Sequence, residues 1–151
     1  MRALIIYKSK YGTAKQYAEW IKEEVEADIF SIDDFNISEI QAYDKIIIVS
    51  ATYMGVIKAD KFLIENWNLL KDKKVYLVAV GLVFTEDAVK TYEQIPAFIR
   101  KNIQYIKIPG KIQYNRLNLF EKIMVKIMKG QNLDKVDRNT IKPVVEFANE
   151  K

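Results

Sequence analysis

The stretch Lys45-Ile46-Ile47-Ile48-Val49-Ser50 decides the fold class. Its four consecutive β-branched apolar residues favour a strand, and they leave no polar residue at alternate positions to face water. A strand without a polar face is buried on both sides, which is typical of a parallel sheet covered by helices. The stretch therefore predicts an α/β protein with a central, fully buried strand.

Similar short apolar runs lie on either side of this stretch, with helical periodicity between them. The further predicted strands are 3–7, 28–32, 75–81 and 105–108. The predicted helices are 13–25, 60–70, 86–102 with a kink or break at Pro96, and 139–149, with Thr13 and Asp60 as candidate caps. This alternation predicts one domain over residues 1–151, a three-layer sandwich in which a five-stranded parallel sheet of order 2-1-3-4-5 carries helices on both faces.

Residues 111–133, between the fifth strand and the last helix, exceed what a five-stranded domain needs and are predicted to be an insertion. Helical spacing gives them an apolar stripe of Leu117, Phe120, Met124, Ile127 and Met128, opposite Lys122, Lys126 and Lys129. Such a basic amphipathic helix fits peripheral contact of residues 117–129 with an anionic membrane surface or an acidic partner. The alternative is a surface helix whose stripe packs on the domain and whose lysines are solvated.

Composition narrows the possible chemistry. The 151 residues contain no His and no Cys, which excludes histidine-based triads, thiolate nucleophiles and the common structural zinc sites. We therefore expect no catalytic acid or base of these types and no metal, and a reactivity supplied by a cofactor. Residues 1–100 carry a net charge of −2 and residues 101–151 a net charge of +6, so the excess positive charge is local.

The sequence also predicts an intracellular location. The longest apolar stretch, 75–84, is ten residues long, well short of the roughly 20 residues of a membrane-spanning helix. The N-terminus has no small-residue cleavage site of a signal peptide. We expect a cytoplasmic protein, with the insertion as its means of reaching the membrane surface.

The predicted ligand site lies at the carboxyl ends of the strands, where open α/β sheets bind their ligands. The loop after the first strand combines hydroxyls, a glycine and a helix start, which are the features of a phosphate cradle. Its candidate residues are Ser9, Lys10, Tyr11, Gly12, Thr13 and Ala14. The same hexapeptide also fits a capped turn that binds nothing. Neither the P-loop pattern nor Gly-x-Gly-x-x-Gly follows the first strand.

The run Ser-x-Tyr-Gly-Thr-Ala after a strand resembles the FMN phosphate loop of flavodoxins. Residues 110–130, which open with Gly-x-x-x-Tyr and continue into a segment rich in Met and Lys, are similar to the long insertion of the flavodoxin-like, menaquinone-dependent protoporphyrinogen dehydrogenases. The resemblance covers essentially the whole chain, and the insertion is its more specific part.

This resemblance implies one non-covalent FMN with its phosphate on the first loop and its ring between the loops after the third and fourth strands. The implied ring contacts are Ser50, Ala51, Thr52, Tyr53, Met54 and Gly55 in one loop, and Gly81, Leu82 and Val83 in the other. Tyr53 would stack on the flavin, and the Gly55 peptide would reorient to bond flavin N5. The alternative for Tyr53 is an ordinary surface aromatic.

Two classes of function follow. The first is an FMN-dependent redox protein, either an oxidoreductase acting on a porphyrinogen or quinone, or a small electron carrier serving a redox partner protein. The second is a flavin-free module that uses the same fold and the basic helix for binding. We find no nucleic-acid-binding motif, and the aromatic residues are not interleaved with the lysines.

Overall fold

The computed structural model describes residues 1–53, 55–81, 85–111, 119–127 and 134–151. Its sheet contains five parallel strands in the spatial order β2-β1-β3-β5-β6. Their bounds are β1 (Ala3–Lys8), β2 (Ala27–Ser31), β3 (Lys45–Tyr53), β5 (Lys74–Gly81) and β6 (Gln104–Pro109). The predicted order is confirmed, because β5 and β6 are the fourth and fifth predicted strands.

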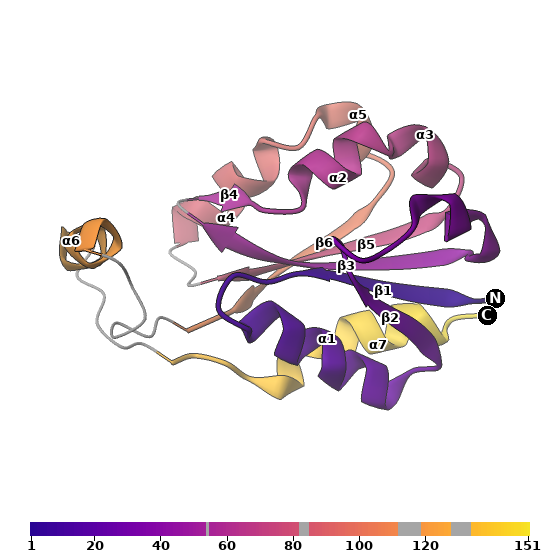
Figure 1. Ribbon diagram of the computed structural model, residues 1–151, viewed down its shortest axis with the longest axis horizontal. Coiled ribbons are helices and arrows are strands. Elements are labelled where there is room, and N and C mark those ends of the chain that lie inside the picture. The colour runs from indigo at the N-terminus through magenta and orange to yellow at the C-terminus, as the bar shows by residue number, and fades with distance from the viewer. Residues whose placement is uncertain (54, 82–84, 112–118, 128–133) are drawn as a thin grey trace.

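Helices cover both faces of the sheet and make the predicted three layers (Figure 1). One face carries α1 (Thr13–Glu24) and α7 (Lys142–Asn149), the latter preceded by the 3-10 turn η3 (Arg138–Ile141). The other carries α2 (Asp60–Glu65), α3 (Trp67–Leu70), α4 (Thr85–Glu93) and α5 (Ala97–Arg100). The 3-10 helix η1 (Ile37–Ala42) connects β2 to β3.

The central stretch of β3 is buried on both faces, as its sequence predicts. Ile46, Ile47, Ile48 and Val49 are each 0% exposed. Ile47 and Val49 pack in the core beneath α1 and α7, whereas Ile46 and Ile48 pack in a second core beneath α2 and α3. Since burying a side chain of this size contributes about 1.5–3 kcal/mol, this strand holds the two outer layers together.

Lys45, at the start of β3, is a buried lysine that the strand pattern does not explain. Its side chain is 1% exposed, and Nζ donates to the carbonyl oxygens of Phe147 (2.8 Å), Ala148 (3.1 Å) and Glu150. Burial, with a smaller contribution from Lys74, lowers the pKa of Lys45. The ammonium therefore satisfies the carbonyls that the end of α7 leaves without intrahelical donors.

Local backbone chemistry corrects several predicted helix boundaries. The N-cap of α1 is Gly12, with φ of +93°, and not Thr13, while the N-cap of α2 is Ala59 and not Asp60. The predicted helix 60–70 divides into α2 and α3 at Asn66, whose side chain returns to the carbonyl of Phe62 at 2.8 Å. The predicted helix 86–102 divides at Pro96, as expected, into α4 and α5.

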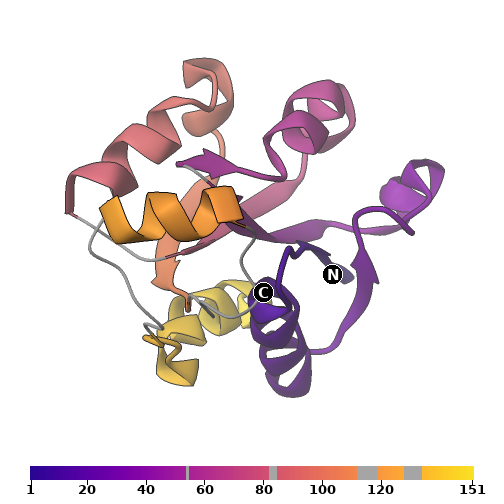
Figure 2. The ribbon, with the colours of Figure 1, turned by 60° about the vertical axis from the view of Figure 1, so that its left-hand side comes forward.

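The insertion contains the helix α6 (Leu119–Ile127), which lies beyond the carboxyl ends of the strands, away from the layers that enclose the core (Figure 1). After a 60° turn, α6 runs across the front of that end of the sheet, between α4 and α1 (Figure 2). An isolated antiparallel bridge joins Lys111 to Asp134, so the chain leaves and rejoins the domain at neighbouring points. None of the helices in the described ranges has the length and apolar character needed to cross a membrane.

Candidate functional site

The loop from β1 to α1 has the geometry of an anion cradle. Gly12 adopts the left-handed conformation, its N–H donates to Ser9 Oγ at 2.9 Å, and its carbonyl accepts from Gln16 at 3.0 Å. Within the described residues, the N–H groups of Thr13 and Ala14 meet no acceptor. A Cβ built on Gly12 would meet no atom within 4 Å, so the approach to this turn is open. The positive end of α1 therefore carries two backbone N–H groups without an acceptor beside an open glycine turn, which suits a phosphate.

A carboxylate from the insertion lies against this loop. Glu121 Oε2 accepts from Lys10 Nζ at 2.8 Å and from the Tyr11 hydroxyl at 2.6 Å. The Glu121 residue is only 6% exposed, although Leu119, Phe120 and Ile123 on the same helix are exposed. Glu121 was not among the site residues predicted from the sequence. The available signal was that it is the one acidic residue among residues 111–133.

Lys10 also contacts Tyr53, a candidate residue in the segment after the third predicted strand. Its Nζ lies 3.4 Å from the centroid of the Tyr53 ring, within the range of a cation–π interaction. Burial alone would lower the pKa of Lys10, but contacts with Glu121, Tyr11 and Tyr53 outweigh it and raise the pKa. Burial and then the hydrogen bond to Glu121 raise the pKa of Tyr11. At neutral pH Lys10 is thus a fixed cation and Tyr11 a neutral donor.

Residues 50–53, which were predicted to lie in a loop, instead form the end of β3 and one side of a short hairpin. β3 continues to Tyr53, and Thr52 and Tyr53 pair antiparallel with β4 (Val56–Ile57). Ser50 Oγ accepts from Ala59 N at 2.9 Å, and Thr52 Oγ1 donates to the carbonyl of Val80 at 3.0 Å. These two hydroxyls hold the end of the sheet together, and the partly buried Ala51 lies between them.

The candidate ring contacts Tyr53 and Gly55 lie at or next to the tip of this hairpin. Gly55 has φ of +77°, and its carbonyl accepts from Gln94 Nε2 at 2.8 Å. Tyr53 lies at the end of β3, partly buried, and Lys58 Nζ approaches its ring to 5.3 Å from the centroid. Met54 lies outside the described residues. The glycine gives this turn a backbone conformation that other residues rarely adopt.

Gly81, predicted in the third loop, is the last residue of β5. Its carbonyl accepts from Gly110 N at 3.1 Å, and a Cβ at Gly81 would overlap Thr52 Oγ1. The absence of a side chain here therefore lets three strand ends meet closely. Leu82 and Val83 lie outside the described residues.

The apolar stripe of the insertion is seen in part. Phe120 is 60% exposed, and its neighbours Leu119 and Ile123 are 76% and 50% exposed. At this end of α6 the large apolar side chains therefore face away from the domain while Glu121 faces it. Leu117, Met128 and Lys129 lie outside the described residues, as do the side chains of Met124, Lys126 and Ile127.

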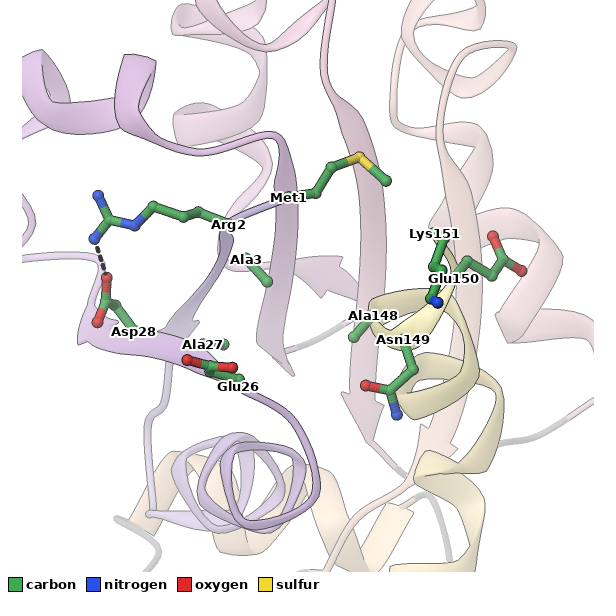
Figure 3. Close-up of a pocket in the computed structure, with 10 residues that line it drawn as sticks. All are labelled: Met1, Arg2, Ala3, Glu26, Ala27, Asp28, Ala148, Asn149, Glu150 and Lys151. Atoms are coloured by element: carbon green, nitrogen blue, oxygen red, sulfur yellow. Dashed lines mark hydrogen bonds and ion pairs between the residues drawn. The ribbon is translucent and has the colours of Figure 1, made fainter.

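A separate hollow of about 720 Å³ lies at the opposite end of the sheet, where the chain termini meet (Figure 3). Its charged lining includes the pair Arg2 and Asp28, whose side chains are 2.9 Å apart. Tyr43 also donates to Asp28, and this bond, together with Arg2, lowers the pKa of that carboxyl. Parallel sheets bind ligands at the other end, so we assign this region to structure.

Comparison with known protein families identifies the family to which the chain belongs. A family model described as Flavodoxin domain matches residues 4–139, and the chain therefore belongs to the flavodoxin domain family. Among curated protein sequences, no match is found.

Solved structures agree with this assignment at the level of the fold. The chain is similar to oxidised Flavodoxin 2 from Bacillus cereus, with 25% identity over 72% of this chain and 84% of the other, at a TM-score of 0.55. It also resembles the flavodoxin of Streptococcus pneumoniae TIGR4, with 14% identity, 99% and 97% coverage and a TM-score of 0.59. A WrbA-like flavodoxin from Agrobacterium tumefaciens matches at 15% identity, 98% and 99% coverage and a TM-score of 0.57.

Proposed function

We propose that this flavodoxin-domain protein binds one FMN non-covalently and acts in redox chemistry. The observation that carries the proposal is the β1–α1 loop, in which Gly12 opens the turn and the N–H groups of Thr13 and Ala14 have no acceptor within the described part of the chain. The family assignment supports it, and similar structures include an oxidised flavodoxin of Bacillus cereus and a two-electron reduced flavodoxin of Megasphaera elsdenii.

The donor set fits the phosphate of FMN. Ser9 and Thr13 contribute hydroxyls, and Lys10 contributes a cation beside the loop. A phosphate bound there would meet the backbone N–H groups and the positive end of the α1 dipole. Bound FMN would supply the electron and hydride transfer chemistry, for which the chain needs no histidine or metal. The residues of the chain would bind and orient it, with Tyr53 and the hairpin around Gly55 on the ring side.

For the substrate, we propose an oxidoreductase of the protoporphyrinogen dehydrogenase type with a quinone acceptor. Two features support this choice over a small electron carrier that serves a redox partner protein. Residues 110–130 resemble the insertion of those dehydrogenases, and residues 101–151 carry a net charge of +6. Positive charge suits a substrate with propionate groups and favours the anionic reduced flavin, whereas acidic surroundings disfavour it.

The same charge supports a peripheral contact with an anionic membrane surface through residues 117–129. Leu119, Phe120 and Ile123 are exposed on α6, and a quinone acceptor resides in the lipid phase. Burying three such side chains in the interfacial region adds to the attraction of nearby lysines for anionic lipid.

Purification and FMN titration test the cofactor. We expect flavin absorbance bands in the visible range and tight uptake of added FMN by the stripped protein. Failure to take up FMN would refute the redox proposal and leave the flavin-free binding module as the explanation.

Anaerobic turnover tests the substrate. FMN-loaded protein is mixed with protoporphyrinogen and a quinone, and porphyrin fluorescence is followed without oxygen. We expect quinone-dependent porphyrin formation. An FMN-loaded protein that shows no turnover would be the electron carrier.

A further inference from the structure

The side chain of Glu121 joins the insertion to the proposed cofactor site. Glu121 lies on α6 and Lys10 and Tyr11 lie in the phosphate loop, more than a hundred positions away in the sequence. Both donors bond the same oxygen of Glu121, at 2.8 Å and 2.6 Å. Charge-assisted hydrogen bonds of this length are among the stronger ones in proteins, and partial burial protects this pair from screening by salt.

The contact extends to the ring side of the site. Lys10 Nζ lies 2.8 Å from Glu121 and 3.4 Å from the centroid of Tyr53. One ammonium therefore links α6, the phosphate loop and the hairpin that follows β3. The phosphate loop and the hairpin are two of the parts of the chain proposed to hold the flavin, and α6 crosses that end of the sheet in front of them (Figure 2).

The environment of Glu121 differs from that of its neighbours on α6. Its side chain is 7% exposed, while Leu119, Phe120 and Ile123 are at least half exposed. In the described part of α6, a buried carboxylate therefore holds the helix to the domain at a point where the neighbouring large apolar side chains face outward. Such a polar attachment releases more easily than a packed apolar face, because water can replace each hydrogen bond that opens.

We propose that Glu121 is a positioning residue that latches α6 across the flavin site, so that FMN enters and leaves when this latch opens. The inference rests on the proposed FMN binding and adds a function for the insertion. A latch of this kind slows both association and release of FMN, and it changes the two rates more than their ratio, the affinity.

The first test uses the protein without FMN. Hydrogen exchange of the α6 amides is compared between wild type, Glu121→Gln and Lys10→Met. Each substitution removes one partner of the charged hydrogen bond, so we expect α6 to exchange about tenfold faster in both variants. We expect the double variant to exchange little faster than Glu121→Gln alone, because Lys10→Met removes a bond that Glu121→Gln has already weakened, whereas Lys10→Met by itself leaves the bond from Tyr11. The control is Glu65→Gln, which makes the same change in an exposed ion pair with Lys61 on α2. Unchanged exchange of α6 in Glu121→Gln would overturn the latch.

The second test measures FMN exchange by stopped-flow flavin fluorescence. In Glu121→Gln we expect association and release each to accelerate about tenfold, with the dissociation constant changed by less than about threefold. Glu121→Asp keeps the charge and is expected to restore slower exchange in part. If Glu121→Gln binds FMN and exchanges it at wild-type rates, the latch is refuted while the proposed FMN binding stands. If the wild-type protein binds no FMN, both the proposed function and the latch are refuted.

Discussion

Two lysines lie at opposite ends of the same parallel sheet. One is bonded to backbone carbonyls and the other to a carboxylate. Lys45, at the amino end of β3, is buried and donates to three backbone carbonyls at the end of α7. Lys10, just beyond the carboxyl end of β1, is one-third exposed and donates to a carboxylate. The pKa of Lys45 is lowered and that of Lys10 is raised. Neutral carbonyls offset only part of the cost of burying a charge, whereas a carboxylate stabilises it directly.

The difference shows how polar groups are used at the two ends. At the amino end, Lys45 holds the last residues of the chain to the sheet, and the pair of Arg2 with Asp28 lines the hollow of Figure 3. At the carboxyl end, Lys10, Tyr11 and Glu121 bond one another beside the open turn at Gly12. Changes at the amino end should therefore affect stability, and changes at the carboxyl end should affect ligand binding.

The largest expected effect is the loss of FMN binding in Gly12→Asp. Two charges about 4 Å apart near a protein surface repel by about 4 kcal/mol, so a carboxylate beside the phosphate should weaken binding at least about 100-fold. Fluorescence titration with FMN measures it. Gly12→Ala is the control, because its Cβ meets no neighbour and only the φ of +93° strains it, a cost of about 1–2 kcal/mol. An Asp variant that binds as tightly as wild type would show that this loop does not hold the phosphate.

At the opposite end, Lys45→Met should destabilise the fold by about 2 kcal/mol, because the partly or fully buried carbonyls at the end of α7 lose their donor. Urea unfolding measures the change. Lys74→Met is the matched control, since Lys74 pairs with Lys45 across the two strands but is exposed. FMN affinity of the folded Lys45→Met protein should equal that of wild type. If fully folded Lys45→Met binds FMN more weakly than wild type, the two ends of the sheet do not act independently.

A third prediction concerns the close packing of strand ends at Gly81. Gly81→Ala would force a Cβ onto Thr52 Oγ1, and overpacking of this kind costs about 1–3 kcal/mol. Adding Thr52→Ala should recover part of the loss, although it also removes the hydrogen bond to Val80. Thermal or urea unfolding of the two single variants and the double variant gives the coupling. Strictly additive losses would mean that the two side chains do not compete for this space.

The smallest effect is expected for Tyr105→Phe. The described residues offer the buried Tyr105 hydroxyl no hydrogen-bond partner, and burial raises its pKa to about 12. Removing an unpartnered hydroxyl should leave stability at pH 7 unchanged or raise it by up to about 1 kcal/mol. Tyr43→Phe is the control, since that hydroxyl donates to Asp28 at 2.7 Å, and its loss should cost about 1 kcal/mol.

The raised pKa of Tyr105 predicts how its contribution to stability changes with pH. The raised pKa means that folded Tyr105 keeps a proton which the unfolded chain releases near pH 10, so its contribution to stability is complete below about pH 10 and is lost toward pH 12. Urea unfolding at pH 7 and pH 11 should therefore show a smaller alkaline loss for Tyr105→Phe than for wild type. Equal losses would indicate that Tyr105 titrates alike in both states.

Much of the fold was predictable because it depends on local patterns. The run Ile46–Val49 required a strand buried on both faces, and the spacing of Tyr17, Ala18 and Ile21 required the inward face of α1. The candidate loop at Gly12 was also visible, since few residues suit a left-handed turn that opens a helix. Less visible was the extension of β3 to Tyr53, because strand pairing with β4 decided it.

What the sequence by itself determined was the order of strands and helices along the chain and the two buried faces of the sheet, because each follows from the periodicity of neighbouring residues. Only the tertiary structure decided that Glu121 meets Lys10 and that Lys45 meets the end of α7. Both pairs join residues about a hundred positions apart, and a charged side chain far from its partner in sequence gives no local sign of which partner it will reach. Packing of the whole domain makes that choice, because it determines which polar groups leave water together and must therefore satisfy one another.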